Sequence, residues 1–300
     1  MVDITHKVTT LRTATAQAIV KAAPETIQAI LENKVPKGNV IEVARTAGLF
    51  AVKNTSSVIP DCHPMPIEYT GIAFECLENS VQIEVTVKTI YKTGVEVEAM
   101  HGASIVALTM YDMLKPIDKN VEISTVKLLT KKGGKSDQVM KIDDLAVAII
   151  VCSDSVSSGN KEDKSGKIIV QKLEKLGLKI SQYTIIPDEI ETIQNQISQL
   201  QNMDLVILTG GTGLSNRDVT PEAIIPLIDR RIPGIEEALR SYGQERTPFA
   251  MLSRSVVGFK GNTLLMALPG SAAGAAESID AVFPSVLHLF QLLDGFDHGK

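Results

Sequence analysis

The sequence predicts two domains of different fold class: an α+β domain with antiparallel strands in residues 1–141, and a three-layer α/β domain with a mostly parallel sheet in residues 142–300. The chain has 300 residues, about twice the length of a common domain. A glycine-rich, polar stretch at 131–137 separates two apolar segments, which indicates a boundary near residue 141. Helix and strand patterns are mixed before this point and alternate regularly after it.

The first 141 residues combine helical periodicity with a hairpin pattern. Pro24 is placed to open a helix whose apolar residues recur at helical spacing. The other expected elements are helices at 38–53 and about 99–115, and strands at 67–76, 81–91 and 121–129. The first two strands alternate apolar and polar residues around 78–80, which is typical of an antiparallel hairpin. Helices segregated from antiparallel strands make this half α+β.

Residues 142–300 predict strands and helices in regular alternation. The expected strands are 145–152, 180–186 and 205–208, and the expected helices are 164–176 and 189–200. The strand at 145–152 is apolar throughout, as is typical of a parallel strand that is covered on both faces. This half is therefore predicted to be α/β.

Composition excludes several classes of protein. Hydrophobic residues make up 44% and charged residues 22% of the chain, which is typical of packed domains and not of a disordered chain. Residues 1–141 carry 16 Lys and Arg against 15 Asp and Glu, and residues 142–300 carry 14 against 20. Because neither half has a basic surplus, nonspecific nucleic-acid binding is not expected. The charge balance does not exclude small anionic ligands, which need only a few cationic residues.

The sequence also predicts a protein of the cytoplasm. No apolar run is long enough to cross a bilayer, so no membrane partner is expected. The first residues lack the order of charges and apolar residues that a secretory signal requires. The three cysteines form no CxxC pair and are odd in number, which supports neither a disulfide framework nor a zinc site.

A glycine-rich loop after a buried strand is the strongest local signal for a ligand site. The strand at 205–208 runs into Thr209-Gly210-Gly211-Thr212-Gly213. Thr220 is expected to cap the next helix, with Pro221 at its first position. Glycines let backbone N–H groups approach a ligand, and a helix N-terminus favours anions. The loop is neither a Walker A motif nor a dinucleotide fingerprint. A tight turn without a ligand is the alternative.

Two carboxylates lie at neighbouring strand ends. Asp188 follows the strand at 180–186, and Asp218 lies in the loop after the glycines. Such a pair can hold Mg²⁺ beside a triphosphate, because Mg²⁺ prefers oxygen ligands and keeps waters and substrate phosphates. An isolated aspartate would more often cap a helix. Together with the glycine loop, the pair favours a metal site.

The second half resembles the molybdopterin-binding family of molybdenum-cofactor biosynthesis (MoaB/MogA type) over about residues 145–295. The matching strings are Thr209-Gly210-Gly211-Thr212-Gly213, Arg217-Asp218-Val219-Thr220-Pro221-Glu222-Ala223, Ile186-Pro187-Asp188-Glu189, Pro233-Gly234 and Leu268-Pro269-Gly270-Ser271. The resemblance implies an adenylyltransferase that uses Mg²⁺ and ATP, in which the terminal phosphate of molybdopterin attacks the α-phosphate of ATP. It implies catalytic and metal-binding roles for Asp188 and Asp218, and substrate contacts for residues 209–213 and Ser271. A pterin-binding or assembly module without catalysis is the alternative.

Two carboxylates in the first half are expected to share a face. If residues 94–98 are extended, Glu96 and Glu98 point to the same side of the strand. Neighbouring carboxylates repel, so such a pair needs a cationic ligand, a basic partner or a role in proton transfer. Solvated charges on a strand are the alternative.

Further polar residues of the first half suggest acid–base chemistry. Asp112 and Lys115 lie three apart near the end of a predicted helix, close enough to form an ion pair. An ordinary surface pair is the commoner meaning of this spacing. His63 lies between two prolines and can bind phosphate or move protons, although a lone histidine is more often structural. Lys37 and Lys53, at the two ends of a predicted helix, add cations.

The first half resembles cyclic pyranopterin monophosphate synthase (MoaC type) over about residues 2–137. The matching strings are Met1-Val2-Asp3, Lys37-Gly38, Ala44-Arg45-Thr46-Ala47-Gly48, Cys62-His63-Pro64, Lys92-Thr93-Gly94-Val95-Glu96, Tyr111-Asp112-Met113 and Gly133-Gly134-Lys135-Ser136. The resemblance implies a ferredoxin-like fold and conversion of a 3′,8-cyclised guanosine triphosphate derivative to cyclic pyranopterin monophosphate, with loss of diphosphate. No cofactor is firmly implied for this half.

The same resemblance implies roles for individual residues. Asp112 and Lys115 are implied to be the acid–base pair. The implied substrate-binding residues are Arg12, Lys37, Lys53, Asp61, Cys62, His63, Glu96, Val97 and Glu98. Asp61 and Val97 depart from the family pattern, where an apolar residue and a Met are common, and we expect these departures to alter substrate affinity.

The two resemblances together predict a bifunctional cytoplasmic enzyme. Its two reactions are not consecutive, because sulfur insertion lies between them. The resemblances also imply a homo-oligomer, a hexamer or a trimer of dimers, because hexameric first halves and trimeric second halves can share a three-fold axis. A non-catalytic scaffold is a weaker alternative, since the residues named above are all present.

Overall fold

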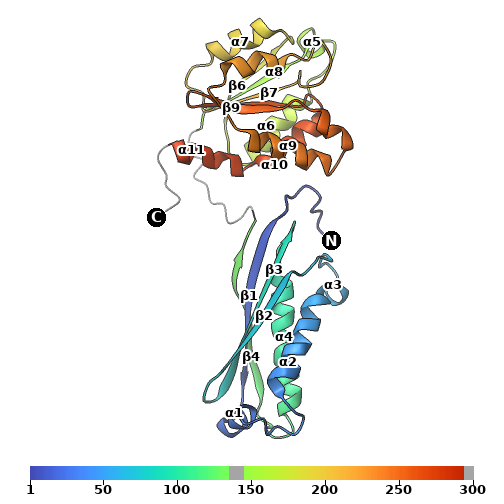
Figure 1. The fold of residues 1–300 in the computed structure, drawn as a ribbon, viewed down its shortest axis with the longest axis vertical. Coiled ribbons are helices and arrows are strands. Elements are labelled where there is room, and N and C mark those ends of the chain that lie inside the picture. Colours follow the sequence, from blue (N-terminus) through green and yellow to red (C-terminus); the bar gives the residue numbers. More distant parts are fainter. Residues whose placement is uncertain (135–144, 294–300) are drawn as a thin grey trace. The chain divides into compact units, whose positions relative to one another are not determined.

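The computed structural model describes residues 1–134 and 145–293, and its contacts divide the chain into two compact units, Met1–Asp137 and Gln138–Lys300 (Figure 1). The predicted boundary near residue 141 lies outside the described residues, as do Lys135 and Ser136 of the glycine-rich motif. Within the described ranges, no helix has both the length and the apolar character needed to span a bilayer.

The N-terminal unit contains one antiparallel sheet with helices packed against it (Figure 1). Its elements are β1 (Thr10–Lys21), α1 (Pro24–Leu31), α2 (Val40–Lys53), α3 (Thr55–Val58), β2 (Tyr69–Cys76), β3 (Ser80–Tyr91), α4 (Glu96–Leu114) and β4 (Glu122–Lys132). The strand order is β2-β3-β1-β4, and every pairing is antiparallel. The elements expected at 38–53, 67–76, 81–91 and 121–129 are therefore present, within a few residues of the predicted ends.

The central strand β1 was not predicted. It pairs with β3 along its whole length and with β4 on its other side. Ala14, Ala16 and Ala18 form its buried side and are fully covered. Alanine is a weak strand former, so the alternation of Ala with Thr and Gln gives little signal in the sequence. Pairing on both edges and the packed helices stabilise the strand instead.

Residues 96–98 are helical, so the expectation that they are extended is wrong. Helix α4 begins at Glu96, three residues before its predicted start. Residues two apart on a helix do not face each other, and Glu98 is buried whereas Glu96 is half-buried. The carboxylates of Glu96 and Glu98 therefore do not share a face. Acidic residues in a first turn are favoured by the helix dipole, which explains why the helix continues through them.

Helices α2 and α4 pack closely through two glycines. A Cβ on Gly48 would collide with Val106 of α4 and lie 2.8 Å from Ile72 Cδ1. A Cβ on Gly102 would lie 2.6 Å from Val52 Cγ2 of α2. The sequence therefore needs glycine on both helices at this crossing.

The C-terminal unit is an α/β domain with a mostly parallel sheet, as predicted (Figure 1). Its elements are β5 (Val147–Cys152), α5 (Asp154–Ser157), α6 (Ser165–Lys175), β6 (Ile180–Ile186), α7 (Ile190–Gln199), β7 (Leu205–Thr209), α8 (Thr220–Ile224), η2 (Ile225–Leu227), β8 (Arg230–Arg231), α9 (Pro233–Gln244), η3 (Pro248–Leu252), β9 (Val256–Lys260), β10 (Thr263–Leu268), α10 (Ala272–Val282), η4 (Ser285–Leu287) and α11 (His288–Leu293). The strand order is β6-β5-β7-β10-β9-β8, and the first four strands are parallel. Strands β9 and β8 add an antiparallel edge.

The sheet of this unit has a core on each face. Val147 and Ile149 of β5 belong to the core that contains residues of α6, α9 and α10. Ala148 and Ile150, which alternate with them, belong to the core that contains residues of α7 and α8. Figure 1 shows these two groups of helices on opposite faces of the sheet. The continuous apolar run of β5 is the consequence of burial on both faces.

We predict that Gly48→Ala destabilises the protein by about 1–3 kcal/mol, because the added methyl group overpacks the α2–α4 crossing. Chemical denaturation of the intact chain, followed by far-UV circular dichroism, measures the change. Gly234→Ala in α9 is the control, since its Cβ would meet nothing within 4 Å. Equal stability of the two variants would contradict the close packing described here.

Candidate functional site

The ends of three central strands meet in the C-terminal unit because glycines let them approach. Gly210 follows β7 with φ of 108°, and a Cβ there would collide with the carbonyl oxygen of Cys152 at the end of β5. A Cβ on Gly270, after β10, would lie 2.9 Å from Gly210 Cα. The hydroxyl of Thr209 donates to the carbonyl oxygen of Pro269, 2.8 Å away. The strand-end loops are thereby joined into one wall.

This wall lines a polar cavity of about 660 Å³. The residues expected at the site that line it are Asp188, Thr209, Gly210, Gly211, Asp218 and Ser271. Thr212 and Gly213 are not among its lining residues. Their carbonyl oxygens instead accept hydrogen bonds from the backbone and the side chain of Arg254. The sequence thus predicted the loop correctly as an element, but only its first half faces the cavity.

Thr220 does not cap helix α8, in contrast to the prediction. The helix begins at Thr220, and Val219 occupies the cap position. The hydroxyl of Thr220 donates to the carbonyl oxygen of Gly210 at 2.9 Å, and its N–H donates to that of Gly211 at 3.1 Å. The side chain therefore fixes the glycine loop to the helix, which is a stronger constraint here than a local cap.

Asp188 is the most perturbed carboxylate of the cavity. Its Oδ1 is buried and has no hydrogen-bond partner, and a Cβ on Gly211 would lie 2.6 Å from that oxygen. Burial raises the pKa of Asp188 to about 6, and the nearby carboxylates of Asp154 and Asp218 add to the rise. An unpartnered carboxylate oxygen in this setting needs a proton or a cation.

Asp154 and Arg217 are polar residues of this site that sequence reasoning did not assign. Arg217 Nη2 donates to Asp154 Oδ1 at 2.8 Å and to Oδ2 at 2.7 Å, and Arg217 Nε donates to Oδ2 at 2.9 Å. Asp154 Oδ1 also accepts from the N–H of Asp188 at 3.1 Å. Asp154 lies two residues after β5, so its position at a strand end could have identified it. Arg217 lies eight residues after β7, and its place next to Asp218 was the only signal for it.

The pair Asp188 and Asp218 fits a divalent cation with oxygen ligands. Asp188 offers a buried, unpartnered oxygen, and Asp218 is close enough to raise its pKa. Among the described residues, no group of three His, Cys, Asp or Glu side chains is arranged to hold a metal ion. Two carboxylates would leave the remaining positions to water and substrate phosphates, as is usual for Mg²⁺.

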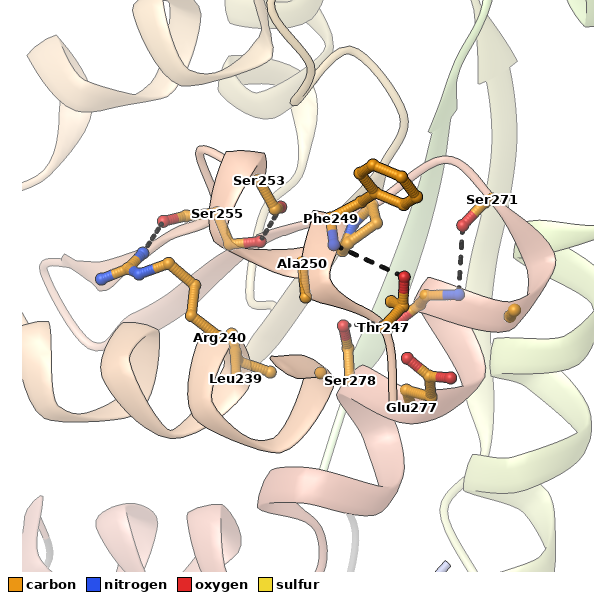
Figure 2. Close-up of a pocket in the computed structure, with 14 residues that line it drawn as sticks. Leu239, Arg240, Thr247, Phe249, Ala250, Ser253, Ser255, Ser271, Glu277 and Ser278 are labelled. Carbon is orange, nitrogen blue, oxygen red and sulfur yellow. Dashed lines mark hydrogen bonds between the residues drawn. The ribbon is translucent and has the colours of Figure 1, made fainter. Parts of the chain in front are cut away.

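The C-terminal unit also contains an apolar cavity of about 400 Å³ (Figure 2). Ser271 lines both cavities. Phe249 and Ala250 of η3 form part of its apolar wall, whereas Glu277 and Ser278 of α10 add polar groups (Figure 2). This cavity has no signal in the sequence, because residues of α9, η3 and α10 form it only in the folded chain.

In the N-terminal unit, Asp112 lies between two ammonium groups. Lys37 Nζ lies 2.7 Å from Asp112 Oδ2 and also donates to the carbonyl oxygen of Asp112 at 2.9 Å. Lys115 Nζ lies 2.8 Å from Asp112 Oδ1, so the expected ion pair is present. Lys115 first, and then Lys37, lowers the pKa of Asp112 to about 2, and Asp112 in turn raises the pKa of Lys115. Near neutral pH the carboxylate is ionised and Lys115 carries the proton.

Cys62 and Glu98 form a second group at the start of α4. The thiol of Cys62 donates to Glu98 Oε1 at 2.9 Å, whereas Glu98 Oε2 is buried without a partner. Burial, and then Glu98, raises the pKa of Cys62 to about 12, so this thiol is a hydrogen-bond donor and not a nucleophile. His63 Nε2 donates to the carbonyl oxygen of Val2 at 2.8 Å, and Asp61 pairs with the N-terminal ammonium group at 3.1 Å.

Arg12 and Glu96 line a small polar cavity of about 190 Å³ with several lysines. Arg12 Nη1 donates to the carbonyl oxygen of Gly133 at 2.8 Å, and Lys131 Nζ lies 3.6 Å from Glu96 Oε1. Lys53, at the end of α2, and Val97 are exposed.

The expected residues of the N-terminal unit therefore form two groups at opposite ends of α4. Glu98 and Asp112 are 14 residues apart on this helix, which corresponds to about 21 Å along its axis. Lys37 and Lys115 lie with Asp112, whereas Cys62 lies with Glu98. Within one chain, a small substrate cannot contact both groups.

Comparison with known proteins assigns both units. Residues 1–134 match the model of the MoaC family, and residues 148–288 match the model described as "Probable molybdopterin binding domain". A molybdenum cofactor biosynthesis bifunctional protein of Chlorobaculum tepidum is 39% identical over 300 residues, which cover 99% of this chain and 96% of that protein. The chain belongs to the bifunctional molybdenum cofactor biosynthesis proteins.

Proteins with only one of the two units resemble the corresponding half of this bifunctional protein. A cyclic pyranopterin monophosphate synthase of Clostridium perfringens is 48% identical over 140 residues, covering 46% of this chain and 89% of the synthase. The molybdopterin biosynthesis enzyme MoaB from Thermus thermophilus, known from a crystal structure, is 38% identical in sequence, with a TM-score of 0.48. The match covers 51% of this chain and 98% of the MoaB chain.

We predict that Asp188→Asn stabilises the bifunctional protein above about pH 6 in metal-free buffer. The folded-state pKa of Asp188 is raised, so the folded chain binds more protons than the unfolded chain between about pH 4 and 6, and its stability falls as pH rises through this window. The expected gain at pH 7.5 is about 1–2 kcal/mol, because partial exposure weakens the effect. Differential scanning calorimetry at pH 7.5 and pH 4 measures it. An unchanged or lower melting temperature at pH 7.5 would contradict the burial of an unpaired charge.

Proposed function

We propose that residues 1–141 convert (8S)-3′,8-cyclo-7,8-dihydroguanosine 5′-triphosphate to cyclic pyranopterin monophosphate and diphosphate. The observation that carries this proposal is the ionic group of Asp112, Lys37 and Lys115. Lys115 holds a proton that it can donate, and the carboxylate of Asp112 fixes its ammonium group in place. The strand order β2-β3-β1-β4, with helices between β1 and β2 and between β3 and β4, supports a ferredoxin-like fold for this domain.

The reaction releases diphosphate, so cations must balance the charge of the triphosphate. Arg12 lines a cavity together with Lys7, Lys131 and Lys132, and among the described residues that line it only Glu96 is acidic. Such a cluster suits phosphate oxygens, which arginine can bind in a bidentate manner. We assign the triphosphate to this end of the unit, together with His63 and Lys53.

The N-terminal active site is proposed to form between two copies of the chain. Asp112 and Glu98 lie about 21 Å apart along α4, so one copy cannot supply both groups to one pterin. A second copy can bring its Asp112 group to the Glu98 end of the first, which makes a homo-oligomer a requirement of the chemistry. A hexamer or a trimer of dimers satisfies this requirement in every site.

For residues 142–300 we propose adenylylation of molybdopterin with ATP and Mg²⁺. The observation that carries this proposal is the unpartnered buried oxygen of Asp188 beside the glycine loop. Asp188 and Asp218 would hold Mg²⁺, which would neutralise phosphate charge when bound. The backbone of Gly210 and Gly211 lines the polar cavity and is suited to phosphate oxygens.

Different parts of the two substrates are assigned to the two cavities of this unit. The terminal phosphate of molybdopterin is the nucleophile, so the chain needs only to orient it toward the α-phosphate of ATP and to balance charge. We assign the phosphates to the polar cavity and the flat pterin to the apolar one. Ser271, which lines both, is at the junction where the reacting phosphate would lie.

We predict that Asp112→Asn abolishes formation of cyclic pyranopterin monophosphate, because the neutral amide no longer holds Lys115, and leaves adenylylation unchanged. Asp218→Asn is expected to reduce adenylylation at least 100-fold and to leave the first reaction unchanged. Each activity is measured in its own assay. The first assay contains the cyclised triphosphate, and the second contains molybdopterin, Mg²⁺ and labelled ATP. Loss of both activities in one folded variant would contradict independent sites. If the wild type forms no adenylylated molybdopterin but binds molybdopterin, the second unit is a binding module.

We predict that two inactive variants restore each other if the N-terminal site is shared between copies. Asp112→Asn and Glu98→Gln are each expected to be inactive alone, because each lacks one half of the site. Mixed oligomers contain some sites with both halves intact, so coexpression is expected to restore up to about a quarter of the activity. An assay of doubly tagged, purified mixtures measures it. No recovery in verified mixed oligomers would contradict a shared site.

A further inference from the structure

Arg254 holds the loop that carries Asp218 at both of its ends. Its Nε donates to the carbonyl oxygen of Gly213 at 2.7 Å, and its Nη2 donates to that of Asp218. Its Nη1 pairs with Glu222 of α8. Its backbone N–H donates to the carbonyl oxygen of Thr212 at 3.0 Å. One residue therefore spans the loop from its start to its end and fastens it to the next helix.

The base from which Arg254 projects is fixed. Ser255, the next residue, is buried and directly precedes β9. The hydroxyls of Ser253 and Ser255 lie 3.1 Å apart, and both serines line the apolar cavity. Arg254 is not among the lining residues of that cavity, and its guanidinium reaches the Asp218 loop. The backbone of Arg254 is therefore anchored next to β9, and its guanidinium reaches from there to the loop.

Apart from Arg254, this loop is held by polar contacts at single points, among them the fork from Arg217 to Asp154. Residues 214–217 are exposed, so no core packing orders them. Asp218 Oδ2 accepts from the N–H of Ser215 at 2.8 Å, and a Cβ on Gly213 would lie 2.7 Å from the same oxygen. The direction of the carboxylate thus depends on how the two ends of the loop lie relative to each other. This relation is what Arg254 fixes.

We propose that Arg254 is a positioning residue that holds the carboxylate of Asp218 in place for the nucleotide and its cation. The proposal rests on the function proposed above for the C-terminal unit. Arginine suits the task because its planar fork reaches three acceptors in different directions, whereas a lysine ammonium on a single stem cannot reproduce this geometry. Arg254 itself acts through Asp218 and is not a catalytic residue.

The test is a double-mutant cycle on binding of Mg²⁺ and the non-hydrolysable analogue AMPCPP to the intact chain, measured by isothermal titration calorimetry. We expect Arg254→Lys to weaken binding about 10-fold, which corresponds to about 1.4 kcal/mol. In the Asp218→Asn background the same substitution is expected to have no further effect, because the group it positions is gone.

Arg230→Lys is the matched control. Arg230 lies on the edge strand β8, where one of its nitrogens donates to a backbone carbonyl, that of Gly261, at 3.2 Å. We expect this variant to bind the analogue as the wild type does. Circular dichroism at rising temperature checks folding of each variant. If Arg254→Lys unfolds, Glu222→Ala replaces it, because that change removes the Nη1 partner and leaves the other two guanidinium contacts. A 2-fold to 3-fold loss that vanishes with Asp218→Asn is then expected.

Two results would overturn the inference. Additive losses in Arg254→Lys and Asp218→Asn would show that the arginine acts independently of the carboxylate. Unchanged binding in a folded Arg254→Lys variant would show that the loop keeps its shape without the fork. If the wild type itself fails to bind Mg²⁺ and AMPCPP, the proposed function fails first, and this outcome is distinct from either of the two.

Discussion

The close approach of three strand ends is the constraint on which the C-terminal site depends. Gly210 touches the last carbonyl group of β5, and Gly270 touches Gly210, so β5, β7 and β10 end almost in contact. Each contact leaves no room for a Cβ. Because the strands end together, the loops that follow them share one wall, and Asp188, Asp218 and Ser271 line one cavity although 83 residues separate the first from the last. The grouping of these polar residues around one cavity therefore depends on glycines that let the strand ends approach each other.

The two units place charge in opposite ways. In the N-terminal unit, Asp112 is matched by Lys37 and Lys115, so its charge is balanced without a ligand. In the C-terminal unit, Asp188 faces other carboxylates, and its Oδ1 has no partner. The ion pairs of Asp112 keep Lys115 protonated, whereas the unpartnered oxygen of Asp188 favours binding of a cation. Each suits a different kind of phosphate chemistry: loss of diphosphate in one, transfer between bound phosphates in the other.

The sequence predicted those features that depend on local pattern. The apolar run of β5 and the glycines after β7 are local signals, and the structure bears them out. Strand β1 was missed, since its alanines are buried by helices far away in the sequence. The extended reading of 96–98 failed because alternation over so few residues cannot be told from the first turn of a helix.

The site could be predicted only where its residues follow a strand directly or lie in a local motif. Asp188 lies two residues after β6, which made it a candidate, whereas Asp218 lies nine residues after β7 and was proposed from its place in the loop motif. The fork between Arg217 and Asp154 joins residues that are 63 positions apart, and Arg254 reaches back 41 positions to Gly213. Such contacts depend on the register of strands and the path of loops, which no local pattern encodes.

The burial of Asp188 would couple the proposed cation binding to protonation of this carboxylate. With a pKa of about 6, the carboxylate is partly protonated in mildly acidic solution, and a cation must displace that proton to bind. Affinity for the cation should therefore fall as pH drops below about 6. The fork between Arg217 and Asp154 opposes this, because it neutralises the neighbouring carboxylate that raises the pKa of Asp188. Arg217 and Asp154, which were not predicted as site residues, thus influence the protonation of Asp188, which was.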